Sequence, residues 1–311
     1  MKWEKKGFIY KPDGEMSWMH SHAYLPTPIV LDDTIRIYMA FWDKDKIGRI
    51  GYIDVGTDDP KNIKNISPTP CLDIGSPGRF DDHGVSPTGI VMKDGIFYLL
   101  YMGWHLSQTI PYQLFTGIAR SSDGKEFSAY NRAPYFDRTR DAPFARSGVS
   151  FVNDDPSWTV LVEGIKWIWF PQYKRYWLDT RLVFEQLRHE QLGDRNRCHI
   201  SLSKEPGEFS FGRPWIVEDK RTYHLFFNTR KVIDPTIYTQ HYAYSEGNLN
   251  NGSMMFNRLI SPLLELGKEG EFDSKSMSHA SIIKVKDKWL MFYCGNDFGG
   301  EGIGYAECKD L

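Results

Sequence analysis

One short phrase recurs along the chain and constrains its fold more than any other feature. Each copy places a small residue among alternating apolar and polar residues, and the five copies occupy residues 50–54, 116–121, 199–203, 241–245 and 303–307. Self-similarity at a spacing of tens of residues indicates a repeat architecture. Short strand-like units of this kind form small antiparallel sheets that stand around an axis. The sequence therefore predicts an all-β, five-bladed propeller.

The two ends of the chain are predicted to meet in one sheet. The last unit ends after its third strand, and Trp3–Pro12 resembles the outer strands of earlier units in pattern. Pairing this N-terminal segment into the last blade would close the ring and cover an exposed sheet edge. Residues 1–311 contain no Pro/Ser-rich linker, so we expect a single domain.

The third unit breaks the rhythm. Its expected strands are Gly148–Asn153, Trp158–Glu163 and Cys198–Ser203, and they leave residues 165–197 as an insertion. The first half of this insertion is aromatic, and Asp179–Leu187 has helical apolar spacing behind a capping Asp. Long segments with such content are usually functional. Two interpretations stay open: a packing patch or homo-oligomer contact, and a wall or lid over the axial cavity.

Composition narrows the class of partner. The formal net charge is −2, whereas nucleic-acid-binding proteins usually carry a basic excess. The N-terminus lacks an apolar signal region and no 18-residue apolar run occurs, so we expect a cytoplasmic protein without membrane insertion. The four cysteines show no CxxC spacing and are predicted to be buried free thiols.

Polar residues gather at one set of strand ends. In a propeller the inner strands begin, and the second strands end, near the same end of the axis, where six of the nine histidines fall. Convergence of this kind is typical of a small-molecule site. The predicted binding residues are His20, His22, Asp81, His83, Trp104, His105, Arg146, Arg213, Arg230, His241, Lys275, His279 and Asn296.

Three stretches resemble a known superfamily. Phe80–Pro87, Tyr101–Trp104 and Arg213–Trp215 are similar to segments of the five-bladed propeller glycoside hydrolases of families 43, 32, 68 and 130. The likeness is greatest to relatives associated with bacterial surface-polysaccharide synthesis. The resemblance implies a sugar in the central cavity, with an Asp as base or nucleophile and a Glu as acid.

Glycoside cleavage needs two carboxyl groups with separated pKa values. The resemblance therefore indicates Asp82 as base or nucleophile, Glu163 as acid and Asp43 as an orienting or pKa-tuning partner. Glu163 follows an apolar strand, where partial burial would raise its pKa and favour the acid role.

The chain also departs from this superfamily. Lys275 follows Asp273-Ser274 where relatives tend to carry a Glu, and the first unit offers His20 and His22 where families 43 and 32 place an Asp. Arginine forks match carboxylates and phosphates. More cationic side chains are predicted around the cavity than a neutral sugar requires, which indicates an anionic sugar, a sugar phosphate or phosphate itself as the ligand. These side chains are Arg146, Arg213, Arg230 and Lys275.

Three functions follow from these features. One is a glycosidase-type enzyme acting by hydrolysis, phosphorolysis or glycosyl transfer. The others are a non-catalytic sugar-binding propeller in glycan biosynthesis and a protein-interaction scaffold that uses the aromatic segment. A metal held by the histidines is an open alternative, but no ligand spacing is diagnostic, and neither a metal nor a cofactor is predicted.

Overall fold

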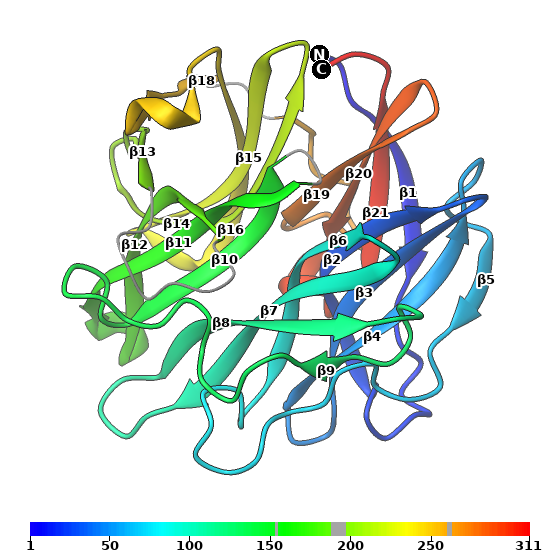
Figure 1. The fold of residues 1–311 in the computed structure, drawn as a ribbon, viewed down its shortest axis with the longest axis horizontal. Coiled ribbons are helices and arrows are strands. Elements are labelled where there is room, and N and C mark those ends of the chain that lie inside the picture. The colour runs from blue at the N-terminus through cyan, green and yellow to red at the C-terminus, as the bar shows by residue number, and fades with distance from the viewer. Residues whose placement is uncertain (153–154, 188–196, 260–262) are drawn as a thin grey trace.

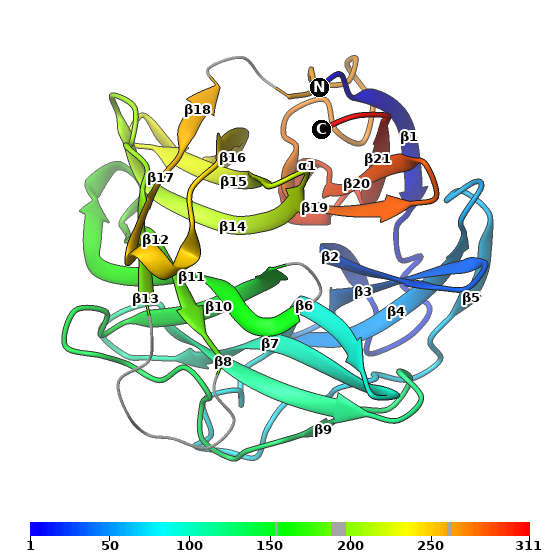
Figure 2. The same cartoon turned by 45° about the horizontal axis from the view of Figure 1, so that its top comes forward.

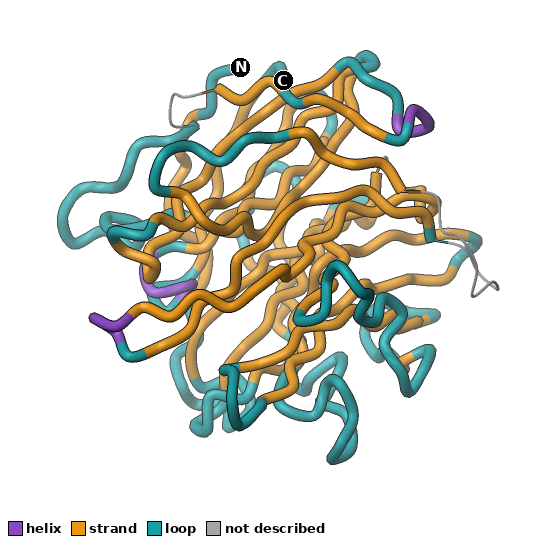
Figure 3. Tube along the Cα trace, turned by 90° about the vertical axis from the view of Figure 1, so that its left-hand side faces the viewer, coloured by secondary structure: helices purple, strands orange, loops and turns teal. Residues whose placement is uncertain are grey.

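The computed structural model describes residues 1–152, 155–187, 197–259 and 263–311. Strands make up most of this trace and loops join them at the periphery (Figures 1 and 3). The short helices are η1 (Pro171–Tyr173), η2 (Leu249–Asn251) and α1 (Asn296–Gly299). None of the helices in the described residues is long and apolar enough to cross a bilayer. All four cysteines are buried and unpaired, as predicted.

Within the described residues, hydrogen bonding joins the strands into four sheets. One contains β2 (Ser21–Leu31), β3 (Thr34–Trp42), β4 (Gly48–Gly56) and β5 (Ile63–Ile66). Another contains β14 (Glu208–Asp219), β15 (Thr222–Lys231), β16 (Asp234–Ser245) and β18 (Asn257–Leu259). A third contains β19 (Ser278–Val285), β20 (Lys288–Cys294), β21 (Ile303–Cys308) and β1 (Glu4–Tyr10).

The largest sheet contains two antiparallel runs. The first has β6 (Val85–Lys93), β7 (Ile96–Leu106), β8 (Tyr112–Ser121) and β9 (Ser128–Ala129). The second has β10 (Ala145–Val152), β11 (Asp155–Phe170), β12 (Arg175–Gln186) and β13 (Arg197–Ser201), with β17 (Ser253–Met255) beside β13. The runs are joined where Ala145 and Arg146 of β10 pair in parallel with Leu114 and Phe115 of β8.

Each of the three smaller sheets, and each run of the largest sheet, has an inner strand, and these inner strands surround a common centre (Figure 2). β2 contacts β6, β6 contacts β10, β10 contacts β14, β14 contacts β19, and β19 returns to β2. The N-terminal strand completes the last sheet, because Glu4 of β1 pairs with Glu307 of β21 and Tyr10 with Ile303. The predicted closure of the ring by the N-terminal segment is thereby confirmed.

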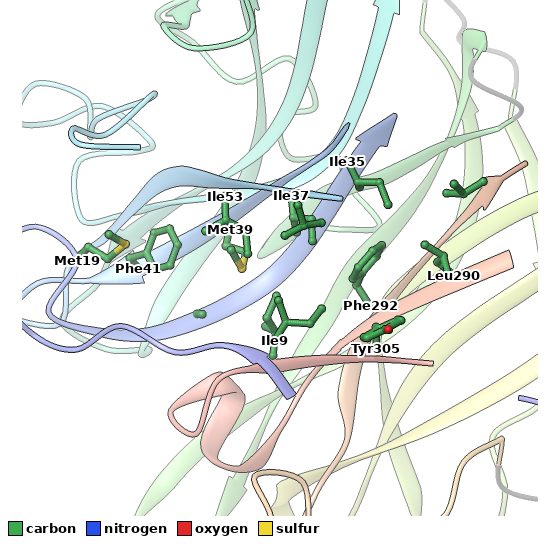
Figure 4. Close-up of a cluster of buried hydrophobic side chains, with 14 residues drawn as sticks. Ile9, Met19, Ile35, Ile37, Met39, Phe41, Ile53, Leu290, Phe292 and Tyr305 are labelled. Atoms are coloured by element: carbon green, nitrogen blue, oxygen red, sulfur yellow. The ribbon is translucent and has the colours of Figure 1, made fainter. Parts of the chain in front are cut away.

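The core lies between neighbouring sheets. Alternate residues of β3 face opposite sides, as the strand period of two requires. Ile35, Ile37 and Met39 pack toward the last sheet, against Phe292 of β20 and Ile9 of β1 (Figure 4). Tyr38, between them, belongs to the cluster shared with β7 and β8. Both faces of such a strand are therefore buried.

The helix predicted over Asp179–Leu187 is wrong, because Arg175–Gln186 form strand β12. Val183 and Phe184 of this strand belong to different core clusters, so apolar residues occur on both faces and no polar alternation marks a strand. β12 is the third strand of its run, and β13 pairs with it as the fourth. Cys198–Ser203, predicted as third strand, therefore lies one position further out, while Asn153 and residues 188–196 lie outside the described residues.

Candidate functional site

Three predicted binding residues occupy equivalent bulges in the inner strands. The strand register shifts around His22 in β2, Arg213 in β14 and His279 in β19. Their φ angles are 59°, 40° and 57°, in the left-handed region that non-glycine residues rarely adopt. A bulge re-aims a side chain, and strain of this kind clusters at functional sites. The shared geometry identifies one end of the inner strands as a candidate site.

His22 and His279 belong to a repeated Ser-His-Ala tripeptide at residues 21–23 and 278–280. In each copy the histidine Nδ1 lies within hydrogen-bond distance of the preceding serine Oγ, at 3.1 and 2.7 Å. His22 stacks on Trp42 with ring centroids 3.8 Å apart, and His279 packs against Tyr238 at 4.7 Å. Both imidazoles thus contact aromatic rings contributed by other strands.

We call these rings and their neighbours the aromatic belt: His22, Trp42, Trp104, Tyr112, Trp167, Tyr238, His279 and Phe298. Its first part runs from β3 to β11 through hydrogen bonds and ring contacts. The Trp42 indole and the Ser86 hydroxyl both donate to the Tyr24 hydroxyl, at 3.1 and 3.2 Å. The Trp104 indole donates to Ser86 Oγ at 3.2 Å. Tyr112 then lies 4.9 Å from Trp104 and 5.1 Å from Trp167.

The second part of the belt closes the path on the other side. Phe298 lies 5.4 Å from Tyr238 and 6.1 Å from His279. The neighbouring Asp297 Oδ2 is 3.8 Å from His22 Nε2. Asp297 and Phe298 have φ angles of 52° and 54°. These contacts therefore link side chains from all the runs of strands around one end of the fold.

Arg230 is the charged group of this site. Its guanidinium carbon lies 3.9 Å from the centroid of the Tyr238 ring, a cation–π contact. The residue is 9% exposed and its Nε has no hydrogen-bond partner. Among the described residues no carboxylate pairs with Arg230. A guanidinium removed from water without a counter-charge is unfavourable, which makes this group ready for an anion.

Arg213, predicted to bind ligand, instead joins the inner strands. Its guanidinium donates to the carbonyl oxygens of Pro26 in β2 and of Pro87 and Thr88 in β6, at 3.0–3.2 Å. It also donates to the hydroxyl of Ser281 in β19. Burial lowers the pKa of Arg213 to about 9, which leaves it charged at neutral pH. The terminal nitrogens are occupied by protein oxygens, so the predicted ligand role is not supported.

The histidines contribute less positive charge than the sequence suggested. Burial, with Arg213 and Arg230 nearby, lowers the pKa of His279 to about 3. Burial, with Arg258 nearby, lowers the pKa of His241 to about 4, and burial also lowers the pKa of His22. These imidazoles are neutral at pH 7 and can exchange hydrogen bonds but not charge with a ligand.

Glu163 is the clearest correction. It is fully buried in β11, where its carboxylate accepts from Arg146 Nε at 3.1 Å, Arg181 Nε at 3.0 Å and Arg197 Nη2 at 2.6 Å. Arg146 also pairs with Glu185 of β12. Burial alone would raise the pKa of Glu163, but attraction to Arg197 and Arg146 outweighs it, and the pKa lies below its ordinary value. The raised pKa expected for a general acid is wrong.

Two other predicted carboxylates are held by arginine. Asp43 caps its own turn by accepting from the Ile47 amide, and Arg49 pairs with it at 2.5 Å. Asp81 is 2% exposed, receives the Tyr101 hydroxyl at 2.9 Å and pairs with Arg79 at 3.1 Å. Both have structural partners that account for their positions.

Two predicted histidines also have structural partners. His20 Nδ1 lies 3.1 Å from the Gly14 carbonyl oxygen. His241 Nε2 lies 2.9 Å from Thr229 Oγ1 and 3.6 Å from Glu208. The His20 amide also donates to the carbonyl oxygen of Trp42, a belt residue, at 2.9 Å.

A cavity of about 690 Å³ adjoins the belt at Tyr238. It is lined by Thr236–Tyr238, by much of the segment 269–278 and by the loop around α1. Lys275 and Asn296, both predicted from the sequence, line it together with Asp297 and Phe298. Asn296 Oδ1 receives the Lys275 amide at 2.7 Å, which fixes this turn. The volume suits a small-molecule ligand.

The remaining predicted residues form a separate cluster. Asp82 Oδ1 lies 2.6 Å from Nδ1 of His83 and 2.8 Å from Nδ1 of His105. The second oxygen of Asp82 accepts from the Gly78 amide at 2.8 Å. Burial opposes ionisation of Asp82, but the His105 hydrogen bond and the Gly78 amide outweigh it and lower its pKa. Catalysis by Asp82 stays a prediction.

Solved structures of glycoside hydrolases are similar to this chain over nearly its whole length. A glycoside hydrolase superposes with a TM-score of 0.70 at 14% identity, covering 99% of this chain and 92% of that one. A thermostable family-43 glycoside hydrolase gives 0.62 at 14% identity, covering 96% and 92%. The chain has the fold of the propeller glycoside hydrolases.

A third neighbour comes from family 130, mannoside phosphorylases that include glycoside hydrolases targeting β-1,2 mannosidic linkages in Candida mannan. Its TM-score is 0.62 at 17% identity, with 99% of this chain and 95% of that one covered. In sequence, the chain is 28% identical to the uncharacterized proteins Rv1502 and MT1551 of two Mycobacterium tuberculosis strains. Each alignment covers 98% of this chain and 99% of the relative. No family model matches.

The predicted binding residues left out five rings of the belt: Trp42, Tyr112, Trp167, Tyr238 and Phe298. Trp167 carried a partial signal, because it lies in the aromatic segment interpreted as a possible wall over the cavity. The left-handed pair Asp297-Phe298 precedes two glycines, a sequence sign of unusual backbone geometry. Tyr112 and Tyr238 lie mid-segment with no local signal of their proximity to other belt residues.

Proposed function

We propose that the protein is a carbohydrate-acting enzyme whose substrate lies against the aromatic belt and carries an anionic group that binds Arg230. The fold supports action on a carbohydrate, since its structural neighbours are glycoside hydrolases. The single observation that carries the anionic substrate is the buried guanidinium of Arg230 without a carboxylate partner among the described residues. An acidic sugar or a sugar phosphate would supply that partner.

The belt supports this proposal on the side of the sugar. Rigid aromatic faces with a few placed polar groups are typical of ligand sites. Lys275, which lines the adjoining cavity and has no ion pair among the residues described, adds a second cation within the same region. We interpret the closed cycle of inner strands as five blades, with the largest sheet counted as two, so that all blades contribute to one site.

The chemistry would be hydrolysis, phosphorolysis or transfer at a glycosidic bond. Such reactions require a carboxyl group within reach of the bond. Asp297 is a carboxylate beside the belt: its side chain is 76% exposed, and its Oδ2 lies 3.8 Å from Nε2 of the His22 imidazole. We propose Asp297 as a participant in that chemistry.

A non-catalytic sugar-binding propeller is the second candidate. It is favoured by the fact that Asp43, Asp81 and Glu163 are each paired with arginine. A pair of free carboxyl groups is therefore not found among these strand-end acids. Incubation with glycans and nucleotide sugars, followed by mass spectrometry, separates the two: a product identifies an enzyme, and saturable binding without product identifies a binding protein.

The anion is tested with matched ligand pairs. Isothermal titration of glucuronic acid against glucose, and of glucose 1-phosphate against glucose, should show tighter binding of the charged member. Loss of a charge-assisted hydrogen bond costs about 1.5–3 kcal/mol. Arg230→Gln should therefore weaken the binding of the charged ligand by about 10- to 150-fold and leave the affinity for glucose unchanged.

Arg120→Gln is the matched control, because Arg120 stacks on Tyr130 at 4.2 Å but is exposed. Equal affinity for charged and neutral ligands, or an unchanged preference in Arg230→Gln, would contradict the proposal.

A further inference from the structure

Asp82, His83 and His105 bring three potential metal ligands together outside the aromatic belt. Their ligand atoms all lie within 4.8 Å of one another. Two are imidazole nitrogens and one is a carboxylate oxygen, a donor set that suits divalent transition metals. The imidazoles are reachable from solvent, with side-chain exposures of 41% for His83 and 36% for His105.

The fold contains an internal control for this cluster. Phe80 stacks on Tyr101 at 5.9 Å, and Phe272 stacks in the same way on Tyr293 at 5.8 Å. Each phenylalanine precedes a buried aspartate that accepts the hydroxyl of the stacked tyrosine at 2.9 Å. The anchoring of the two turns is therefore equivalent in the sheets that contain β7 and β20.

The residues after this shared anchor differ. Ser274, Lys275 and Asp297 of the last sheet occupy the sequence positions that correspond to Asp82, His83 and His105. The repeated anchor forms with either set, so folding does not require two histidines and an aspartate at these positions. Their presence in only one of the two turns points to a ligand.

The three side chains are also held rigidly. The His83 amide donates to the Trp104 carbonyl oxygen at 3.0 Å, and the Trp104 amide donates to Gly84 at 2.9 Å, which ties the turn to the end of β7. The Gly78 amide orients the Asp82 carboxylate from behind. A metal site needs this support, because ligands whose orientation is fixed by neighbouring hydrogen bonds bind more tightly.

We propose that Asp82, His83 and His105 bind one divalent transition-metal ion, through Asp82 Oδ1 and the Nδ1 atoms of the two histidines. Binding through Nδ1 requires that the remaining proton of each imidazole lie on Nε2, which frees Nδ1 as a ligand. Ligands about 2.1 Å from Zn²⁺ lie roughly 3.4 Å apart in tetrahedral geometry. The distances from Asp82 Oδ1 to the two Nδ1 atoms are now 2.6 and 2.8 Å, so each would increase by less than one ångström when the ion binds.

Three protein ligands leave at least one coordination position for water or for a substrate oxygen. This arrangement bears on the role predicted for Asp82. A carboxylate that ligates a metal is not available as a free base or nucleophile, so the two roles exclude each other.

Zn²⁺ uptake tests the proposal. Protein treated with EDTA and dialysed against Zn²⁺ should retain one ion per chain by mass spectrometric metal analysis. His83→Ala and His105→Ala should each weaken Zn²⁺ binding at least tenfold in titration calorimetry, and the double variant should abolish it. His199→Ala, at an exposed histidine of β13, is the matched control and should bind as the unaltered protein does.

Replacement of Zn²⁺ by Co²⁺ supplies a spectroscopic readout, with visible absorption bands that disappear in the double variant. Asp82→Asn retains the shape of the side chain and should also lose tight binding, which covers the case in which a histidine variant folds poorly. The proposal is overturned if the unaltered protein takes up no more Zn²⁺ than the double variant. Sugar binding at Arg230 is measured separately and does not depend on this result.

Discussion

Glu163→Gln distinguishes a structural from a catalytic carboxylate in β11. The substitution keeps the volume of a side chain that is 0% exposed but removes the negative charge that three arginines share. Breaking a buried ion pair by removing one partner costs about 3–5 kcal/mol, because the remaining charge stays buried without compensation. Here Arg146, itself 3% exposed, would retain Glu185 as its one carboxylate partner among the described residues.

The expected change in melting temperature follows from chain length. Unfolding entropy is about 2.1 cal/mol/K per residue. For 311 residues a loss of about 3–5 kcal/mol corresponds to a decrease of roughly 5–8 °C. Differential scanning calorimetry at pH 7 measures this shift, with Glu246→Gln at an exposed position as the control expected to change by less than one degree.

The pH dependence of the melting temperature tests the same assignment independently. The pKa of Glu163 is lowered from an ordinary value of 4.5, so its stabilisation is present above that pH and is lost as the pH falls through the lowered value. The melting temperatures of the protein and of Glu163→Gln should therefore converge as the pH falls below 4.5 and through the lowered pKa of Glu163. An unchanged melting temperature in Glu163→Gln, together with lost turnover, would refute the structural assignment and restore the role of general acid.

Two further predictions concern the centre of the fold and its histidines. Arg213→Met keeps much of the side-chain volume but removes the donors to Pro26, Pro87 and Thr88, so it should lower the melting temperature by several degrees. The control Arg138→Met, at the exposed surface, should leave the melting temperature unchanged. Equal melting temperatures of the two variants would show that Arg213 does not join the strands. Affinity for an acidic sugar with a constant charge should change by less than twofold between pH 5.5 and 8, because His279 has a pKa of about 3 and stays neutral throughout. Calorimetric titration across that range checks it, and a tenfold gain in affinity on acidification would show that a histidine supplies the charge.

The sequence by itself determined the all-β class and the pairing of the two chain ends. Local repeats indicated strands throughout, and the unpaired last unit indicated that Trp3–Pro12 would complete the last sheet, where Glu4–Tyr10 pairs with Ile303–Cys308. These features depend on strand periodicity and on neighbouring segments, which local sequence encodes. Both faces of the strand Arg175–Gln186 are buried, so its sequence lacks the alternation of apolar and polar residues that marks a strand. Its apolar spacing therefore indicated a helix.

Only the tertiary structure decided what each polar side chain does. Arg213 and Arg230 looked alike in the sequence. Arg213 donates to oxygens from β2, β6 and β19, whereas Arg230 lies against the ring of Tyr238 and has no carboxylate partner in the described part of the chain. Glu163 looked like a catalytic acid until Arg181 and Arg197 were placed beside it. The charge and accessibility of these arginine and glutamate side chains depend on partners that the closure of the ring brings together. The pattern of residues within a strand does not indicate which partners those are.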